Sequence, residues 1–182
     1  MPSKIERCAI YIRVSTAEQM MHGKSLEAQK QYLTNYAKEH NMTVAGVARY
    51  IQKFETRDPF ELAEHLNVEV QTGPMGSRSG CYMFLKNHKC VFLNEDLEEH
   101  ERILVMAHEL AHSIMHRKEN CYFIRNKTLL LTSKMEIEAN TFAAELLIPD
   151  DLIYENPGLS KAQIARIAGY DEKIMEFKKI DK

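Results

Sequence analysis

The sequence predicts an α+β fold, in which a small β-sheet is followed by two long helices. Two short apolar runs, 81–85 and 90–93, flank the polar stretch 86–89, a pattern that is typical of a β-hairpin. Two longer runs, 97–115 and 133–148, then carry apolar residues at helical spacing. Strands followed by helices, rather than alternating with them, favour this fold class.

A shorter β-α(-β) segment precedes this arrangement. Residues 8–14 are apolar and rich in β-branched side chains, as expected of a buried strand. Residues 26–40 have helical spacing with Ser25 as N-cap, and residues 42–47 are expected to return as a second strand. We therefore expect two parts, residues 1–48 and residues 49–182.

The remaining helices are marked by their ends. Pro59 opens a helix over 59–66, because proline is favoured at the first helical position. Asn94 is expected to cap the helix 97–115, whose first turn is acidic. Pro149 ends the helix 133–148. Two short helices, 161–168 and 172–178, close the domain.

Composition excludes several classes of protein. The 182 residues carry 24 Lys and Arg against 26 Asp and Glu, a net charge of -2. A protein held to nucleic acid by phosphate contacts is usually basic, so direct nucleic-acid binding is not expected. No apolar run approaches the roughly 18 residues that a membrane span needs.

The cysteines indicate a reducing compartment. Cys8, Cys81, Cys90 and Cys121 form no Cys-x-x-Cys pair, which argues against a structural zinc site or a redox motif. The N-terminus lacks the apolar core of a secretory signal, since Arg13 interrupts its apolar stretch. We expect a cytoplasmic protein with neither membrane segment nor disulfide framework.

The first of the long helices carries His108-Glu109-Leu110-Ala111-His112. On a helix, His108 and His112 leave the same face one turn apart, so both can reach one Zn²⁺ at about 2.0–2.1 Å. Glu109 would serve as general base toward a water at the metal. The alternative is a surface helix with two solvated histidines, but the flanking apolar residues argue for burial, and buried imidazoles need partners.

A catalytic zinc also needs a third protein ligand and an open position. His116 continues the spacing, but it lies about 12 Å from His108 along the helix axis, too far to share one ion. It is expected to be a helix-terminal cation or a solvated residue.

The better candidate for the third ligand is Glu136, at the inward edge of the apolar stripe of the second helix. Asn140 points the same way and could orient His108 or His112. Glu138 is the fallback ligand, although it projects beside Glu145 on the polar back of the helix. A different interpretation stays open, because Glu136 also fits a capping box with Ser133.

Several ordered motifs resemble those of the ImmA/IrrE family of zinc metallopeptidases, from about residue 54 to the C-terminus. They are Thr56-Arg57-Asp58-Pro59-Phe60, Gly80-Cys81-Tyr82, the His-Glu-x-x-His segment, and the run from Glu136 to Pro149. The resemblance implies a gluzincin-like domain with His108, His112 and Glu136 as zinc ligands and Glu109 as catalytic base. It also implies cleavage of a helix-turn-helix repressor of a mobile element or toxin-antitoxin-like pair. A strand such as 81–85 could bind the substrate backbone by edge addition.

The N-terminal segment resembles the start of serine recombinase (resolvase) catalytic domains. The similarity lies in Tyr11-Ile12-Arg13-Val14-Ser15-Thr16 and in the segment from Ser25 to Gln29. It implies Ser15 as a DNA-attacking nucleophile and Arg13 as a phosphate contact. The segment ends after one strand and one helix, so we expect a remnant that packs on another domain or chain.

Three functions follow from these observations. The first is a zinc endopeptidase that cleaves a repressor. The second is a catalytically silent repressor-binding or toxin-like protein with the same fold. The third is a DNA recombination accessory that acts through Ser15.

Overall fold

The structure, a computed structural model, describes residues 46–117, 121–124 and 134–180, and the backbone alone for 121–124. The chain divides into two compact units, Met1–Met42 and Thr43–Lys182. The predicted strand 8–14, the helix 26–40 and Ser15 lie outside the described residues. The domain boundary near residue 48 stays a prediction.

A four-stranded mixed sheet forms one layer of the second unit. Its strands are β1 (Val68–Gly73), β2 (Arg78–Leu85), β3 (His88–Asn94) and β4 (Cys121–Ile124), in the order β1-β3-β2-β4. β1 runs parallel to β3, whereas β2 is antiparallel to both β3 and β4. The register aligns Val70, Val91 and Tyr82 in one row, and Val91 and Tyr82 in it are fully buried.

The predicted hairpin is present and tighter than expected. Its loop is the pair Lys86 and Asn87, and both residues have positive φ, 46° and 69°. Two-residue hairpin loops with positive φ at both positions match the twist of the flanking strands. The strands therefore extend to Leu85 and from His88.

The sheet topology corrects the expected substrate edge. β2 pairs with β3 on one side and, from Arg78 to Tyr82, with β4 on the other. The expectation that 81–85 adds a substrate strand is therefore contradicted at Cys81 and Tyr82, which pair on both sides. The edge strands among the described residues are β1 and β4. The sequence also failed to predict β1, because Val68–Gly73 is short and mostly polar.

Three helices, α3 (Pro59–His65), α4 (Glu99–Met115) and α5 (Lys134–Leu147), confirm the predicted runs to within one or two residues. Asp58 caps α3 by accepting a hydrogen bond from the N–H of Phe60 at 2.7 Å.

Asn94 does not cap α4. It ends β3, and its buried side chain donates to the carbonyls of Gly76 and Arg78 at 3.1 and 2.9 Å. Glu98 precedes α4 without a side-chain cap. The prediction was wrong because a distant turn, absent from any local pattern, uses the amide of Asn94.

Residues 46–54 are helical, so the strand predicted over 42–47 is contradicted at Gly46 and Val47, the two of its residues that are described. Val47 is 2% exposed and joins the main core. Burial on one helical face, rather than β-sheet pairing, explains its apolar character.

The C-terminal segment forms short helices around a second core. α6 (Asp150–Tyr154) follows Pro149, which is its N-cap, and α7 (Lys161–Ile167) begins at Ser160 with a capping box. A 3₁₀ helix, η2 (Glu172–Glu176), replaces the helix predicted over 172–178. Ile164, Ile174 and Met175 pack with Ala144 and Ile148, at the C-terminal end of α5.

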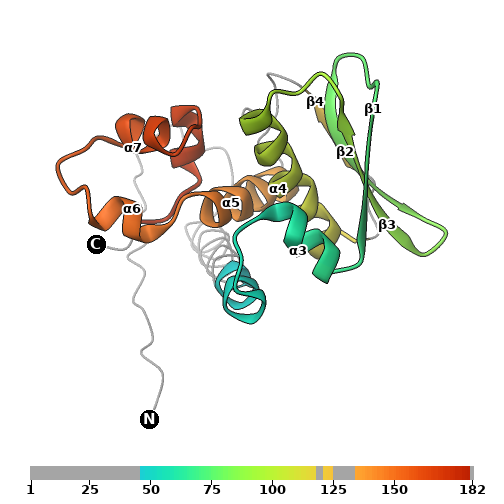
Figure 1. The fold of residues 1–182 in the computed structure, drawn as a ribbon, viewed down its shortest axis with the longest axis horizontal. Coiled ribbons are helices and arrows are strands. Elements are labelled where there is room, and N and C mark those ends of the chain that lie inside the picture. Colours follow the sequence, from blue (N-terminus) through green and yellow to red (C-terminus); the bar gives the residue numbers. More distant parts are fainter. Residues whose placement is uncertain (1–45, 118–120, 125–133, 181–182) are drawn as a thin grey trace, which may run out of the picture. The chain divides into compact units, whose positions relative to one another are not determined.

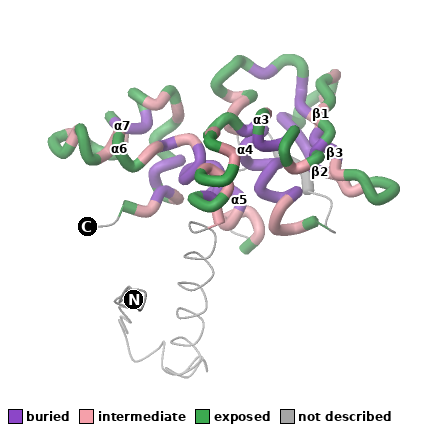
Figure 2. Tube along the Cα trace, turned by 60° about the horizontal axis from the view of Figure 1, so that its bottom comes forward, coloured by how far each residue is buried: buried purple, intermediate pink, exposed green. Residues whose placement is uncertain are grey.

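Helix α4 lies between the sheet and α5 (Figure 1). The main core forms around it from the buried faces of the sheet, α3 and α5, and Figure 2 shows the buried residues gathered there. Nine consecutive residues of α4, from Val105 to Ser113, are buried. Polar side chains in that stretch must therefore find partners inside the protein. None of the described helices combines the length and apolar composition needed to cross a bilayer.

Candidate metal centre

Helix α4 directs two imidazoles at one point. His108 and His112 are each 1% exposed, and their Nε2 atoms lie 3.0 Å apart. The four-residue spacing places both rings on one helical face, as predicted. That face is turned toward α5.

Helix α5 brings a carboxylate to the same point. Glu136 places Oε2 3.2 Å from Nε2 of His108, and Oε1 3.5 Å from Nε2 of His112. Among the described residues, these three form a group that could hold a metal ion, with ligand atoms within 4.8 Å of one another. The sequence-based choice of Glu136 is compatible with this geometry. The alternative capping partner, Ser133, lies outside the described residues.

The geometry fits a tetrahedral ion. Ligands at about 2.0–2.1 Å from a tetrahedral zinc are separated from one another by about 3.3 Å. The observed separations of 3.0, 3.2 and 3.5 Å bracket that value.

The hydrogen bond between His108 and Asn140 supports the same conclusion. Nδ1 of His108 lies 2.9 Å from Oδ1 of Asn140, which can only accept, so Nδ1 carries the ring proton. The lone pair of Nε2 therefore points at the carboxylate of Glu136 and at His112. Lone pairs gathered this closely repel one another unless a cation lies between them. The contact is compatible with the predicted role of Asn140 in orienting His108.

Burial keeps the second imidazole neutral. Burial, followed by the electrostatic effect of His108 and His116, lowers the pKa of His112 to about 2. A neutral imidazole is the form that binds a metal. Nδ1 of His112 is buried without a hydrogen-bond partner among the described residues.

Glu109 lies on the side of α4 that faces β2. It is 0% exposed, and no side chain among the described residues forms a hydrogen bond or an ion pair with its carboxylate oxygens. Burial raises the pKa of Glu109 well above its ordinary value, and the charge of Glu136 raises it further, while the backbone N–H of Tyr82 lowers it in part. Glu109 is therefore a buried acid beside the metal ligands and outside the group that would bind the ion.

Gly80 allows this approach between helix and strand. A Cβ atom built on Gly80 would lie 2.6 Å from Cγ1 of Val105 and 3.4 Å from Cγ of Glu109. Any side chain there would push β2 away from α4. Sequence reasoning quoted Gly80 in a motif but missed this role. A glycine inside a strand pattern, which often marks a close approach, was the available signal.

The other acidic and basic candidates are placed differently from expectation. His116 is neither free nor solvated, because its Nε2 lies 3.3 Å from Oε2 of Glu138 and its side chain is 10% exposed. Glu138 is 13% exposed and Glu145 is buried, so neither lies on a polar back of α5. The helical projection failed because segments distant in sequence cover that side of α5.

Two histidines and one glutamate around a shared point, with a buried acid beside them, form a group that could hold a metal ion, as the metal centres of metallopeptidases do. The comparisons with known proteins agree with that class. Residues 63–175 match the IrrE N-terminal-like domain of the Peptidase_M78 family, and the chain belongs to that family.

Two relatives extend the similarity. The chain is 34% identical over 142 residues to "Uncharacterized immunity region protein 2" of Bacillus phage phi105, covering 76% of this chain and 90% of that protein. It is 26% identical over 138 residues to "Metallopeptidase ImmA" of Bacillus subtilis (strain 168), covering 72% of this chain and 80% of that protein. The predicted resemblance to the ImmA/IrrE family is confirmed.

A second match lies at the N-terminus. Residues 8–55 match the resolvase N-terminal domain, which confirms the resemblance of this segment to serine recombinases.

Proposed function

We propose that this chain is a zinc-dependent endopeptidase of gluzincin-like fold that acts in the cytoplasm on a helix-turn-helix repressor. The main support is that the ligand atoms of His108, His112 and Glu136 lie within 4.8 Å of one another, beside the buried carboxyl group of Glu109. The peptidase domain would comprise residues 49–182, with residues 1–48 as a resolvase-like appendage.

Each residue has a distinct role in this proposal. His108, His112 and Glu136 hold the ion, and Asn140 keeps Nδ1 of His108 protonated. When bound, zinc would polarise the scissile carbonyl and lower the pKa of water at its open position. The carboxylate of Glu109 accepts the proton of the attacking water and delivers it to the departing amide nitrogen. Its burial excludes bulk water that would otherwise compete for that proton.

Strand β4 is the better candidate for binding the substrate backbone. It is an edge strand among those described, and it pairs with β2 at Gly80, beside Glu109. An extended peptide added to its outer edge would run close to the metal centre. This replaces the earlier placement on 81–85.

The substrate class rests on the relatives. One of them carries the name of a phage immunity region and the other the name of a metallopeptidase. A peptidase of an immunity region would act on the repressor that maintains immunity. Cys81 and Cys90 are free thiols, in keeping with a reducing cytoplasm.

Metal analysis and a matched pair of variants test the proposal. The purified chain should hold about one zinc and cleave a helix-turn-helix protein encoded beside it. Glu109→Gln should keep zinc but lose about 10²–10⁴-fold in cleavage rate, the usual contribution of a general base. Glu99→Gln, an exposed change on the same helix, should have no effect. A chain without zinc affinity would end the proposal.

Two other functions give different outcomes. A silent repressor-binding protein would bind the repressor tightly and leave it intact at every zinc concentration. A recombination accessory would form a covalent DNA adduct that Ser15→Ala abolishes. The charge balance of the chain and the buried metal-ligand group favour the peptidase over both.

A further inference from the structure

Helices α4 and α5 pack against each other in the main core. Both carry buried alanines there, Ala107 and Ala111 on α4 and Ala139 and Ala143 on α5. Small side chains allow the helices to approach closely, but they interdigitate little. Packed helices with such surfaces can slide along each other by small amounts. Polar contacts therefore help to fix the axial position of α5, and the hydrogen bond between His108 and Asn140 and the contact between His116 and Glu138 do so near its N-terminal end.

That position matters because α5 carries the third ligand. The carboxylate oxygens of Glu136 lie 3.2 and 3.5 Å from the two imidazole nitrogens. Sites of this kind need their groups held to within about 0.5 Å. A slide of α5 by about 1 Å would take Glu136 out of ligand range.

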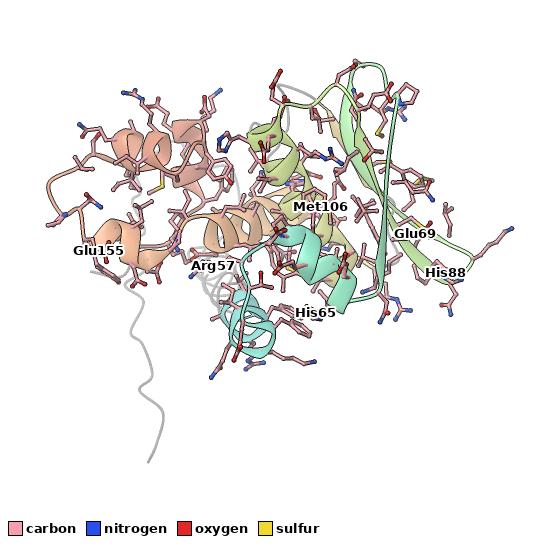
Figure 3. All side chains as sticks on the ribbon, viewed as in Figure 1. Arg57, His65, Glu69, His88, Met106 and Glu155 are labelled. Atoms are coloured by element: carbon pink, nitrogen blue, oxygen red, sulfur yellow. The ribbon has the colours of Figure 1, made fainter. Side chains whose placement is uncertain are left out.

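The C-terminal end of α5 is held by Arg57, which lies in the segment leading into α3 (Figure 3). Its Nη1 donates to the carbonyls of Glu145 and Leu146, both at 3.0 Å. These carbonyls belong to the last helical turn, where no backbone N–H is available and the helix dipole attracts cations. Arg57 therefore forms hydrogen bonds directly with the backbone of α5.

Residues of the C-terminal tail make a second set of contacts with the end of α5. Nζ of Lys178 lies 2.6 Å from Oε2 of Glu145 and 2.5 Å from Oδ1 of Asp150. The backbone N–H of Lys179 donates to Oε1 of Glu145 at 2.8 Å. Lys178 is 5% exposed and Glu145 is 7% exposed, so water screens this pair little.

We propose that Arg57 and Lys178 are positioning residues for the metal centre: by locking the C-terminal end of α5, they set the axial position of Glu136. These contacts are made at Glu145, nine residues from Glu136 and about 13 Å away along the helix, and they involve neither the metal nor the substrate. Both anchors come from outside the two ligand-bearing helices. This inference rests on the proposed function only in taking Glu136 as a zinc ligand.

Zinc affinity of the full-length chain, measured by competition with a chelating dye, tests the inference without any substrate. Arg57→Met should weaken zinc binding by roughly 10-fold or more, the size of effect typical of residues that orient metal ligands. Arg57→Lys, which retains a cation, should recover part of the loss. The cobalt-substituted Arg57→Met protein should also show an altered visible spectrum.

The control is Asp58→Ala, in the same loop. It removes the N-cap of α3 and lowers thermal stability without touching α5. Its zinc affinity should equal that of the unchanged chain. For the tail, the paired change Glu145→Gln with Lys178→Met removes both buried charges at once and avoids an unpaired charge that could prevent folding.

A double-mutant cycle separates positioning from general stability. In a Glu136→Gln background, Arg57→Met should have little further effect on zinc affinity, because the group it positions is already lost. Equal losses in both backgrounds, or a folded Arg57→Met protein with unchanged affinity, would overturn the inference. If the unchanged chain itself binds no zinc, the proposed function fails instead.

Discussion

Two buried charged clusters of this protein are satisfied in opposite ways. Near the C-terminal end of α5, Glu145 has a cation, Lys178, and a backbone N–H from Lys179. At the metal centre, Glu109 is fully buried, and it forms no ion pair with a described residue. A buried charge without a partner of opposite charge is costly. The difference is the one expected if folding completes the first cluster and a bound ion completes the second.

Breaking the completed cluster should have the largest effect on stability. Glu145→Gln leaves the ammonium of Lys178 buried with only the exposed carboxylate of Asp150 as partner. Removing one member of a buried pair costs about 3–5 kcal/mol, and Asp150 should keep the loss near the lower end. Urea unfolding of the metal-free protein measures it. Glu155→Gln, the same change at an exposed position, should be neutral within about 0.5 kcal/mol.

The equivalent change at the metal centre sharpens the contrast. Glu109→Gln removes a buried carboxyl group that forms no ion pair with a described residue and leaves an amide oxygen for the backbone N–H of Tyr82, so the metal-free protein should keep or gain stability. A loss as large as that of Glu145→Gln would show that Glu109 has a stabilising partner inside the fold. The comparison between the two clusters would then be wrong.

Removing the zinc ion should lower the stability of the folded chain, because the metal-ligand group would then lack its cation. Zinc that binds only the folded chain should stabilise it by about 2.7 kcal/mol at 100 times its Kd and about 4.1 kcal/mol at 1,000 times. Chelation should therefore lower the Tm, and added zinc should restore it. The double variant His108→Ala with His112→Ala should show no such response. A Tm that ignores zinc in the unchanged chain would contradict the assignment.

The thiol of Cys81, on the neighbouring strand β2, is a probe of the buried carboxyl group of Glu109. Burial first, and then the charge of Glu109, raises the pKa of this thiol from 9.0 to about 11. Two units reduce the thiolate about 100-fold at pH 8, so alkylation of Cys81 should be at least that much slower in the folded chain than in urea. The neutral thiol stabilises the fold below pH 9, and this contribution is lost as pH rises through 11.

A variant separates the two causes of that shift. Glu109→Gln should increase the alkylation rate of Cys81, measured by mass spectrometry of peptides, but only in part, because burial is the larger cause. If the rate reached that of the unfolded chain, burial would not be the main cause.

A further prediction concerns Asn140. Asn140→Ala removes the acceptor that fixes the tautomer of His108, and such partners contribute about 10–100-fold in metal affinity. Zinc competition measures the change, and Asn140→Asp should retain affinity because it still accepts from Nδ1. Equal affinities for Asn140→Ala and the unchanged chain would remove Asn140 from the site.

Local pattern was sufficient for much of the fold and the candidate site. The spacing of His108 and His112 requires a shared face on any helix, and the inward position of Glu136 follows from the apolar stripe beside it. The hairpin, α3, α4, α5 and α7 were predictable for the same reason, since their periodicity and end signals lie within a few residues. The cap assigned to Asn94 and the strand at 42–47 failed because the deciding contacts are remote in sequence.

The sequence by itself determined that His108 and His112 share one helical face, because helical geometry sets which side chains do so. Only the tertiary structure decided which partner each acid on α5 meets. Glu138 reaches His116 and Glu145 reaches Lys178, 33 residues away, whereas Glu136 reaches the Nε2 atoms of His108 and His112. The physical reason is that a charge is satisfied by whatever packs against it, and the chain's path through space, not its local pattern, supplies those neighbours.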